Sequence, residues 1–134
     1  MKNILALLLS SILLLLSDHG FANAGVSAKY VDRGDVVQIC IHVSSPAPPA
    51  FIVMQKHARG VHLIAANPLP VNGLGKPAAK WLFRRPASGN HTIVLRFSKP
   101  IAPNQVKGEI RYRHPGNQAM ITKNILREGI TVAH

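Results

Sequence analysis

The chain has 134 residues, with 16 lysine and arginine side chains against 5 aspartate and glutamate side chains, so its net charge is +11. This length favours one domain with one hydrophobic core. The single cysteine excludes an intramolecular disulfide framework. The positive charge predicts attraction to anionic partners such as acidic polysaccharide, anionic lipid head groups or nucleic acid, and it also serves solubility.

The first 24 residues have the pattern of a secretory signal peptide. One lysine precedes an apolar run from Ile4 to Leu16, and Ala22-Asn23-Ala24 forms a small-x-small cleavage site. The run is shorter than the roughly 20 residues that a membrane-spanning helix needs. We therefore expect cleavage after Ala24, a periplasmic or secreted domain at residues 25–134, and no integral membrane segment in the mature chain.

Alternation of apolar and polar residues predicts a series of short β-strands. Val106 to Arg113 illustrates the pattern, with its even-numbered residues inward and its odd-numbered residues outward. No stretch has a sustained helical period with caps. Turn signals about every 10 residues predict an all-β fold, a single antiparallel β-sandwich. The strands expected are residues 26–31, 36–43, 51–56, 61–66, 80–84, 92–97, 106–113, 119–125 and 130–132.

The stretch from Lys80 to Phe97 is the clearest strand pair in the chain. It holds the only tryptophan, Trp81, on the inward parity of its strand. Gly89-Asn90 tolerates positive φ and follows Pro86, which predicts that the two strands fold back as a hairpin. The proline-rich segment 44–49 cannot sit inside a sheet and is expected to connect sheets or run along an edge.

Several motifs between residues 36 and 122 resemble the Ig-like repeats of bacterial and archaeal cell-surface proteins. They are Ala58-Arg59-Gly60-Val61 before a strand, Trp81 on the next strand, Pro86-Ala87-Ser88-Gly89 before the aliphatic Ile93-Val94-Leu95, and Gly108 to Arg113 on a later strand. The resemblance implies an Ig-like sandwich and an extracytoplasmic setting, and it brings no catalytic residues. The chain differs from those repeats in being one basic unit, with Ala58 where a proline is usual.

Basic residues gather near the predicted central strands, mostly at outward parity. If these strands are neighbours, one sheet face carries a stripe of positive charge that suits phosphate or carboxylate. The alternative is a solvated face whose aliphatic stems cover the sheet. Inward aromatic residues argue against base stacking, so nucleic acid is the less favoured anion. The candidate anion-binding residues are Lys80, Arg84, Arg85, Arg96, Lys107, Arg111 and Arg113.

Cys40 and His42 lie two apart on one strand face, so both could reach one metal ion. Met54 and Met120 could add soft ligands, which would suit copper. A buried, inert thiol is the favoured alternative for Cys40. This set is a weak metal candidate, and the sequence predicts no cofactor.

Catalytic chemistry has few residues to use, because the chain contains no nucleophile elbow and no metalloprotease signature. We therefore expect an exported, non-enzymatic binding module that contacts anionic envelope polymers or a protein partner. The first alternative is an accessory structural subunit of a surface or secretion assembly, joined through exposed sheet edges. A periplasmic copper-binding protein ranks below it.

Overall fold

The computed structural model describes residues 25–33, 36–101 and 105–127, which form nine strands. The strands are β1 (Val26–Arg33), β2 (Val36–Val43), β3 (Ala50–His57), β4 (Leu63–Asn67), β5 (Ala78–Arg84), β6 (Gly89–Phe97), β7 (Val106–Arg113), β8 (Met120–Asn124) and β9 (Leu126–Arg127). Within these ranges no helix is long and apolar enough to cross a bilayer. The predicted signal peptide and the predicted strand at residues 130–132 lie outside the described residues.

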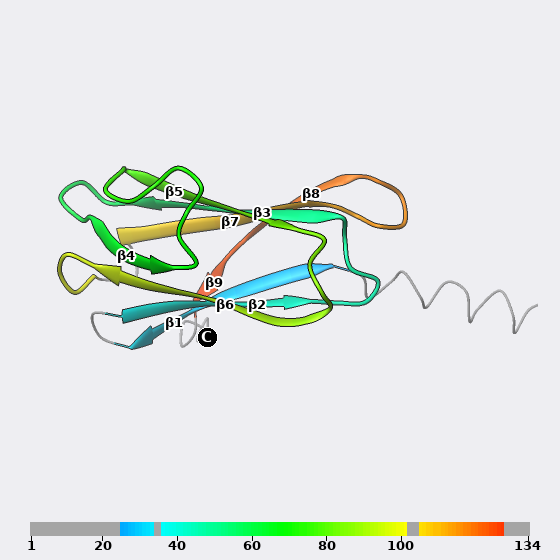
Figure 1. Ribbon diagram of the computed structural model, residues 1–134, viewed down its shortest axis with the longest axis horizontal. Coiled ribbons are helices and arrows are strands. Elements are labelled where there is room, and N and C mark those ends of the chain that lie inside the picture. Colours follow the sequence, from blue (N-terminus) through cyan, green and yellow to red (C-terminus); the bar gives the residue numbers. More distant parts are fainter. Residues whose placement is uncertain (1–24, 34–35, 102–104, 128–134) are drawn as a thin grey trace, which may run out of the picture.

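The strands form two packed sheets (Figure 1). The first, sheet A, has the order β4-β6-β2-β1-β9, and the second, sheet B, has the order β5-β3-β7-β8. All pairings are antiparallel except the short parallel pairing of β1 with β9. The predicted all-β sandwich is therefore confirmed, with one parallel pair that the sequence did not indicate.

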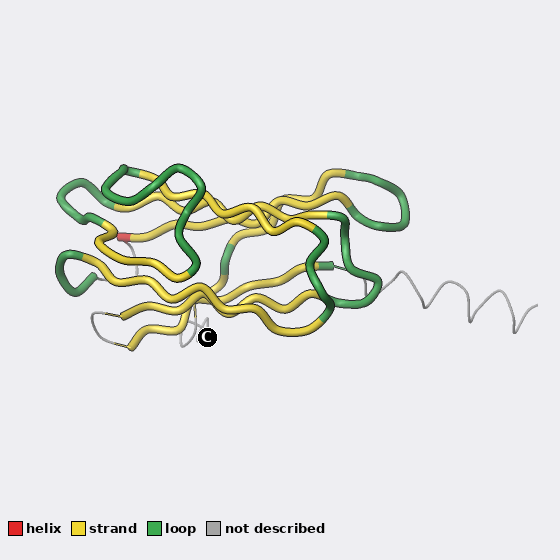
Figure 2. Tube along the Cα trace, in the orientation of Figure 1, coloured by secondary structure: helices red, strands yellow, loops and turns green. Residues whose placement is uncertain are grey.

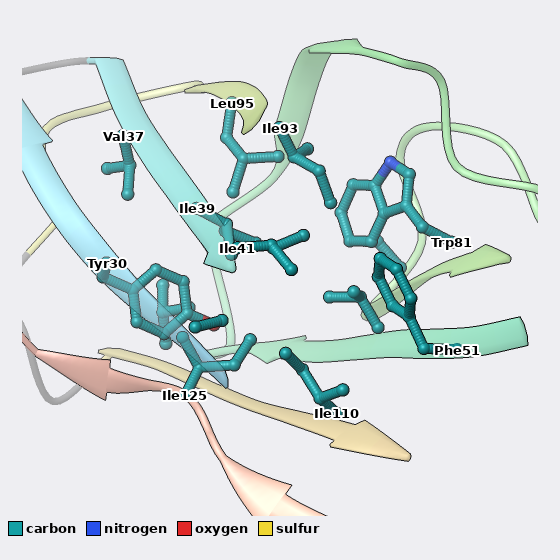
Figure 3. Packing of buried hydrophobic residues seen from close by; sticks show 14 of the residues in the cluster. Tyr30, Val37, Ile39, Ile41, Phe51, Trp81, Ile93, Leu95, Ile110 and Ile125 are labelled. Atoms are coloured by element: carbon teal, nitrogen blue, oxygen red, sulfur yellow. The ribbon is translucent and has the colours of Figure 1, made fainter. Parts of the chain in front are cut away.

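Apolar side chains from the inner faces of both sheets make one core (Figure 3). Trp81 and Phe51 of sheet B point toward Ile93 and Ile41 of sheet A, and all four are almost completely buried. The Trp81 indole nitrogen donates a hydrogen bond to the Pro68 carbonyl oxygen at 2.8 Å, so its one polar atom is satisfied.

The predicted alternation of faces is confirmed in the long strands. In β2, Val37, Ile39, Ile41 and Val43 are buried, whereas the residues between them are more exposed. In β7 the buried and exposed residues also alternate as predicted. These faces could be predicted because successive side chains of a strand point to opposite sides of the sheet.

The predicted hairpin between residues 80 and 97 is wrong. Strand β5 belongs to sheet B and β6 to sheet A, so residues 85–88 carry the chain from one sheet to the other. Gly89 does adopt a positive φ of 115°, but it opens β6 after this crossing. Turn residues indicate that the chain changes direction, and they do not say whether the next strand joins the same sheet.

The proline-rich segment 44–49 connects β2 in sheet A to β3 in sheet B, as one of its two predicted roles required. It lies at the same end of the sandwich as the β5–β6 crossing (Figure 2). The Arg85 amide donates a hydrogen bond to the Pro49 carbonyl oxygen at 2.8 Å. The two crossings are therefore tied together at this end.

Candidate anion-binding face

The outer face of sheet B carries six exposed cationic side chains, which we call the basic face. Their strands β5, β3 and β7 are neighbours in the sheet, and each residue has the outward parity of its strand. One acidic residue, Glu109, lies on the same face. The members of the basic face are Lys56, Lys80, Arg84, Lys107, Arg111 and Arg113.

Two lysines of the basic face lie directly opposite each other. Lys56 of β3 pairs in register with Lys107 of β7. Like charges directly opposite on neighbouring strands destabilise a sheet. Beside this pair is a hollow of about 220 Å³, whose lining includes both lysines, Met54 and Asn124. An anion held between the two ammonium groups would relieve their repulsion.

Glu109 neutralises part of the basic face. Its Oε1 lies 2.7 Å from an Arg111 terminal guanidinium nitrogen, and both side chains are partly exposed. The Arg111 Nε also donates to the same oxygen at 3.1 Å. Arg113 donates a longer hydrogen bond, 3.3 Å, to the Gln118 carbonyl oxygen. Arg111 is therefore already engaged, whereas no ion pair within the described residues involves Lys56, Lys80, Arg84 or Lys107.

The structure brings together five of the seven predicted anion-binding residues: Lys80, Arg84, Lys107, Arg111 and Arg113. Arg85 lies just beyond β5, in the turn toward β6, with a positive φ of 48°. Arg96 is on β6 and therefore on the opposite sheet. The predicted stripe thus joins β5 and β7 across β3, and it does not reach β6.

The sequence reasoning missed Lys56. Its strand reads Ala50-Phe51-Ile52-Val53-Met54-Gln55-Lys56-His57, with Phe51, Val53 and Gln55 buried. Lys56 therefore has the outward parity of its strand, and the alternation of apolar and polar residues in the sequence already indicated this orientation. Its closeness to Lys107 could not be predicted, since that depends on the pairing of β3 with β7.

The weak metal candidates Cys40 and His42 lie on the outer face of sheet A, in a hollow of about 490 Å³. Cys40 is half-buried, so it is not the fully buried thiol that the sequence favoured. The His42 Nδ1 lies 2.9 Å from the Asn90 Oδ1. Because that oxygen accepts, Nδ1 donates this hydrogen bond.

The predicted soft ligands do not join this hollow. Met54 is on β3 and Met120 is on β8, so both belong to sheet B, whereas Cys40 lies on the outer side of sheet A. Among the described residues no group of three or more His, Cys, Asp and Glu side chains is placed to hold a metal ion. The four-ligand set suggested by the sequence is therefore wrong.

A buried polar chain crosses the core between the sheets. The Tyr30 hydroxyl of β1 donates to the Gln55 Oε1 of β3 at 2.9 Å. The Gln55 amide nitrogen lies 3.4 Å from the His57 Nδ1, while the His57 Nε2 is buried without a hydrogen-bond partner. Burial raises the pKa of Tyr30, and the nearby Arg127 lowers it by less.

The pKa of His57 is lowered, first by burial and second by the charge of His62. The neutral imidazole is therefore the form that the fold prefers. Gln55 is completely buried and is held from both sides by Tyr30 and His57. This chain is a structural link between the sheets, and it lies apart from the basic face.

Comparisons of the chain with protein-family models, with curated proteins and with solved structures found no match.

Proposed function

We propose that this protein is an exported, non-enzymatic binding module whose basic face holds anionic polymers of the cell envelope. The observation that carries the proposal is the opposition of Lys56 and Lys107 within six cationic side chains on one sheet face. Folding does not require this arrangement, because like charges in register cost stability. A bound polyanion supplies the compensating negative charge.

The extension of the basic face over three neighbouring strands favours a polymer over a small ligand. Strands in a sheet lie about 4.8 Å apart, so the cationic columns of β5 and β7 stand roughly 10 Å apart on either side of β3. The β3 column between them presents the half-buried Ala50, Ile52 and Met54. Arginine and lysine side chains along two parallel columns can contact successive charges of an extended anion.

The strand order supports the further proposal that the domain is Ig-like. Constant-type Ig domains have one sheet of order A-B-E-D and a second of order C-F-G. The order β1-β2-β6-β4 in sheet A corresponds to the first, and β3-β7-β8 in sheet B corresponds to the second. Strand β5, beside β3, and strand β9, beside β1, are additions to that pattern. The secretory pattern of residues 1–24 supports export.

A salt titration of binding to heparin, lipopolysaccharide and duplex DNA tests the basic face. For duplex DNA, the logarithm of affinity falls with the logarithm of salt concentration by about 0.9 for each phosphate contacted. Replacing both Lys56 and Lys107 with alanine should make this slope shallower by about 1.8. The matched control replaces Lys29 and Arg96 with alanine. Both are cations of sheet A, so this double variant loses the same net charge.

Equal changes of slope in the two double variants would show that net charge alone drives binding, and would overturn the proposal. Sequence preference among DNA probes should be absent, because phosphate contacts carry no direct sequence information. Tighter binding of heparin or lipopolysaccharide than of DNA at equal salt is expected of an envelope-binding module.

A further inference from the structure

Strand β5 is an edge strand of sheet B, and only part of its free edge is covered. The Lys80 carbonyl oxygen accepts from the Val71 amide at 2.7 Å. The Asn72 side chain bonds the Lys80 amide at 3.0 Å and the Ala78 carbonyl oxygen at 2.9 Å. The loop between β4 and β5 therefore acts as a short substitute for a neighbouring strand.

The cover ends before Leu82. Alternate residues of an antiparallel edge strand turn their backbone groups in the same direction. Since Ala78 and Lys80 face the free edge, Leu82 and Arg84 face it too. The described backbone hydrogen bonds outside the strand ladders include none from Leu82 or Arg84. This part of β5 presents unpaired donors and acceptors to any segment that lies beside it.

The open edge borders a hollow of about 460 Å³ whose lining includes both apolar and cationic side chains. Leu69, Val71 and Leu82 line it and are exposed by 66%, 63% and 37%. Arg84 and Arg85 also line it, and neither forms an ion pair within the described part of the chain. Exposed apolar side chains beside an uncovered edge are a liability in a free protein.

We propose that the uncovered edge of β5, at Leu82 and Arg84, binds an extended acidic segment of a partner protein by adding it as a further strand of sheet B. Backbone groups of the partner would pair with Leu82 and Arg84, an apolar side chain would enter the hollow, and a carboxylate would meet Arg84 or Arg85. The sequence suggested assembly through exposed sheet edges, and this proposal places that assembly at the free edge of β5.

The charge of the chain selects the partner. A second copy carries the same excess of 16 basic over 5 acidic side chains, so two copies repel each other at this arginine-lined edge. An acidic segment is attracted instead, and bidentate pairing with arginine favours carboxylates. The site is separate from the Lys56–Lys107 pair, because Lys56 pairs with Ala78 at the start of β5, whereas Leu82 and Arg84 pair with Ile52 and Ala50 at the other end of β3.

The probe is a ten-residue peptide that alternates glutamate with valine or threonine. Three matched ligands accompany it: the same peptide N-methylated at every second residue, a version with lysine in place of glutamate, and heparin. N-methylation removes the edge hydrogen bonds and leaves the charges unchanged. We expect it to weaken binding about tenfold, and the lysine version to bind no better than buffer controls. Amide hydrogen exchange at Leu82 and Arg84 should slow when the unmodified peptide binds.

The protein variants separate the edge from the basic face. Leu82→Ser should weaken peptide binding, while Val94→Ser, at a residue of equal 37% exposure on sheet A, should not. Arg85→Glu should weaken it about tenfold, whereas the matched Arg96→Glu should have little effect. Arg113→Ala should lower heparin binding and leave peptide binding unchanged.

Equal binding of the N-methylated and unmodified peptides would overturn the proposal, as would unchanged exchange at Leu82 and Arg84. A peptide affinity that falls with Arg113→Ala as much as with Arg85→Glu would also overturn it, since binding would then be unspecific attraction to the basic face. Loss of heparin binding alone would count against the proposed function and not against this edge site.

Discussion

The outer faces of the two sheets differ, although their inner faces are built alike. Sheet B presents Lys56 and Lys107 in register, with four further cations around them and one carboxylate. The β2 strand at the centre of sheet A presents Gln38, Cys40 and His42 instead, all uncharged side chains when the histidine is neutral. Both inner faces consist mainly of aliphatic and aromatic residues, with Gln55 of β3 as a buried polar exception.

This difference separates what folding needs from what it leaves free. A strand at the surface of the core requires apolar residues on its inward face, whereas almost any polar residue is compatible with its solvent-exposed face. Sheet A, whose outer face carries Lys29 and Arg96 among uncharged side chains, shows that this fold is compatible with a less charged outer face. The charges of sheet B are therefore additional to the fold, and they point to a task at that surface.

The largest expected effect comes from removing the core that both faces share. Trp81→Ala should lower the free energy of unfolding by about 3–5 kcal/mol, because it empties the largest fully buried site. Urea unfolding measures the loss. Heparin binding to the basic face and the β-sheet circular dichroism signal should be lost in one transition. Trp81→Phe, which keeps most of the ring, should cost less, and two separate transitions would contradict a single cooperative unit.

A smaller loss is expected at Gly108, where a side chain of β1 packs against the backbone of β7. A Cβ added at Gly108 of β7 would collide with the Tyr30 hydroxyl of β1 and lie 2.6 Å from the Ile125 Cδ1. Gly108→Ala should therefore lower the free energy of unfolding by about 1–3 kcal/mol. Combining it with Tyr30→Phe, which removes the colliding oxygen, should recover part of the loss in a double-mutant cycle. Strict additivity of the two changes would show that the hydroxyl is not the obstacle.

Removing the carboxylate of the basic face should strengthen the difference between the two faces. Glu109→Gln frees Arg111 from its ion pair, so the salt dependence of DNA binding should steepen by about 0.9, one further phosphate contact. Asp32→Asn in β1 of sheet A changes the net charge by the same amount. If both variants steepen the slope equally, the effect belongs to net charge and not to the basic face.

The smallest effect is a pH dependence at the centre of the sandwich. Because the pKa of His57 is lowered by burial and by His62, the unfolded chain binds more protons than the folded chain near and below the usual histidine value of about 6.5. Stability should therefore be full above about pH 6.5 and fall as the pH drops through that value. His57→Gln should flatten this decline in thermal unfolding experiments between about pH 8 and about pH 5. An unchanged decline in the variant would assign it to other groups.

The sequence predicted the inner and outer parity of β2, β5 and β7 correctly, because that parity follows from a period of two. It wrongly predicted that β5 pairs with β6, and for this reason it placed Arg96 with the residues of β5 and β7. The same limit hid the opposition of Lys56 and Lys107. The contact of Asn72 with β5 could not be predicted either, because it depends on the conformation of a loop that has no periodic sequence pattern.

The crossing of the chain between sheets at residues 85–88 has a consequence for the route by which the protein folds. Of the seven strand pairings in the described residues, β1–β2 and β7–β8 join consecutive strands, and the others join strands separated by at least one element. The β1–β2 and β7–β8 hairpins can therefore form early, whereas neither sheet can be completed until long loops close. Topologies dominated by such distant pairings fold in milliseconds to seconds. During that interval β3 and β6, which each need two distant neighbours, remain the unpaired strands on which correct assembly depends.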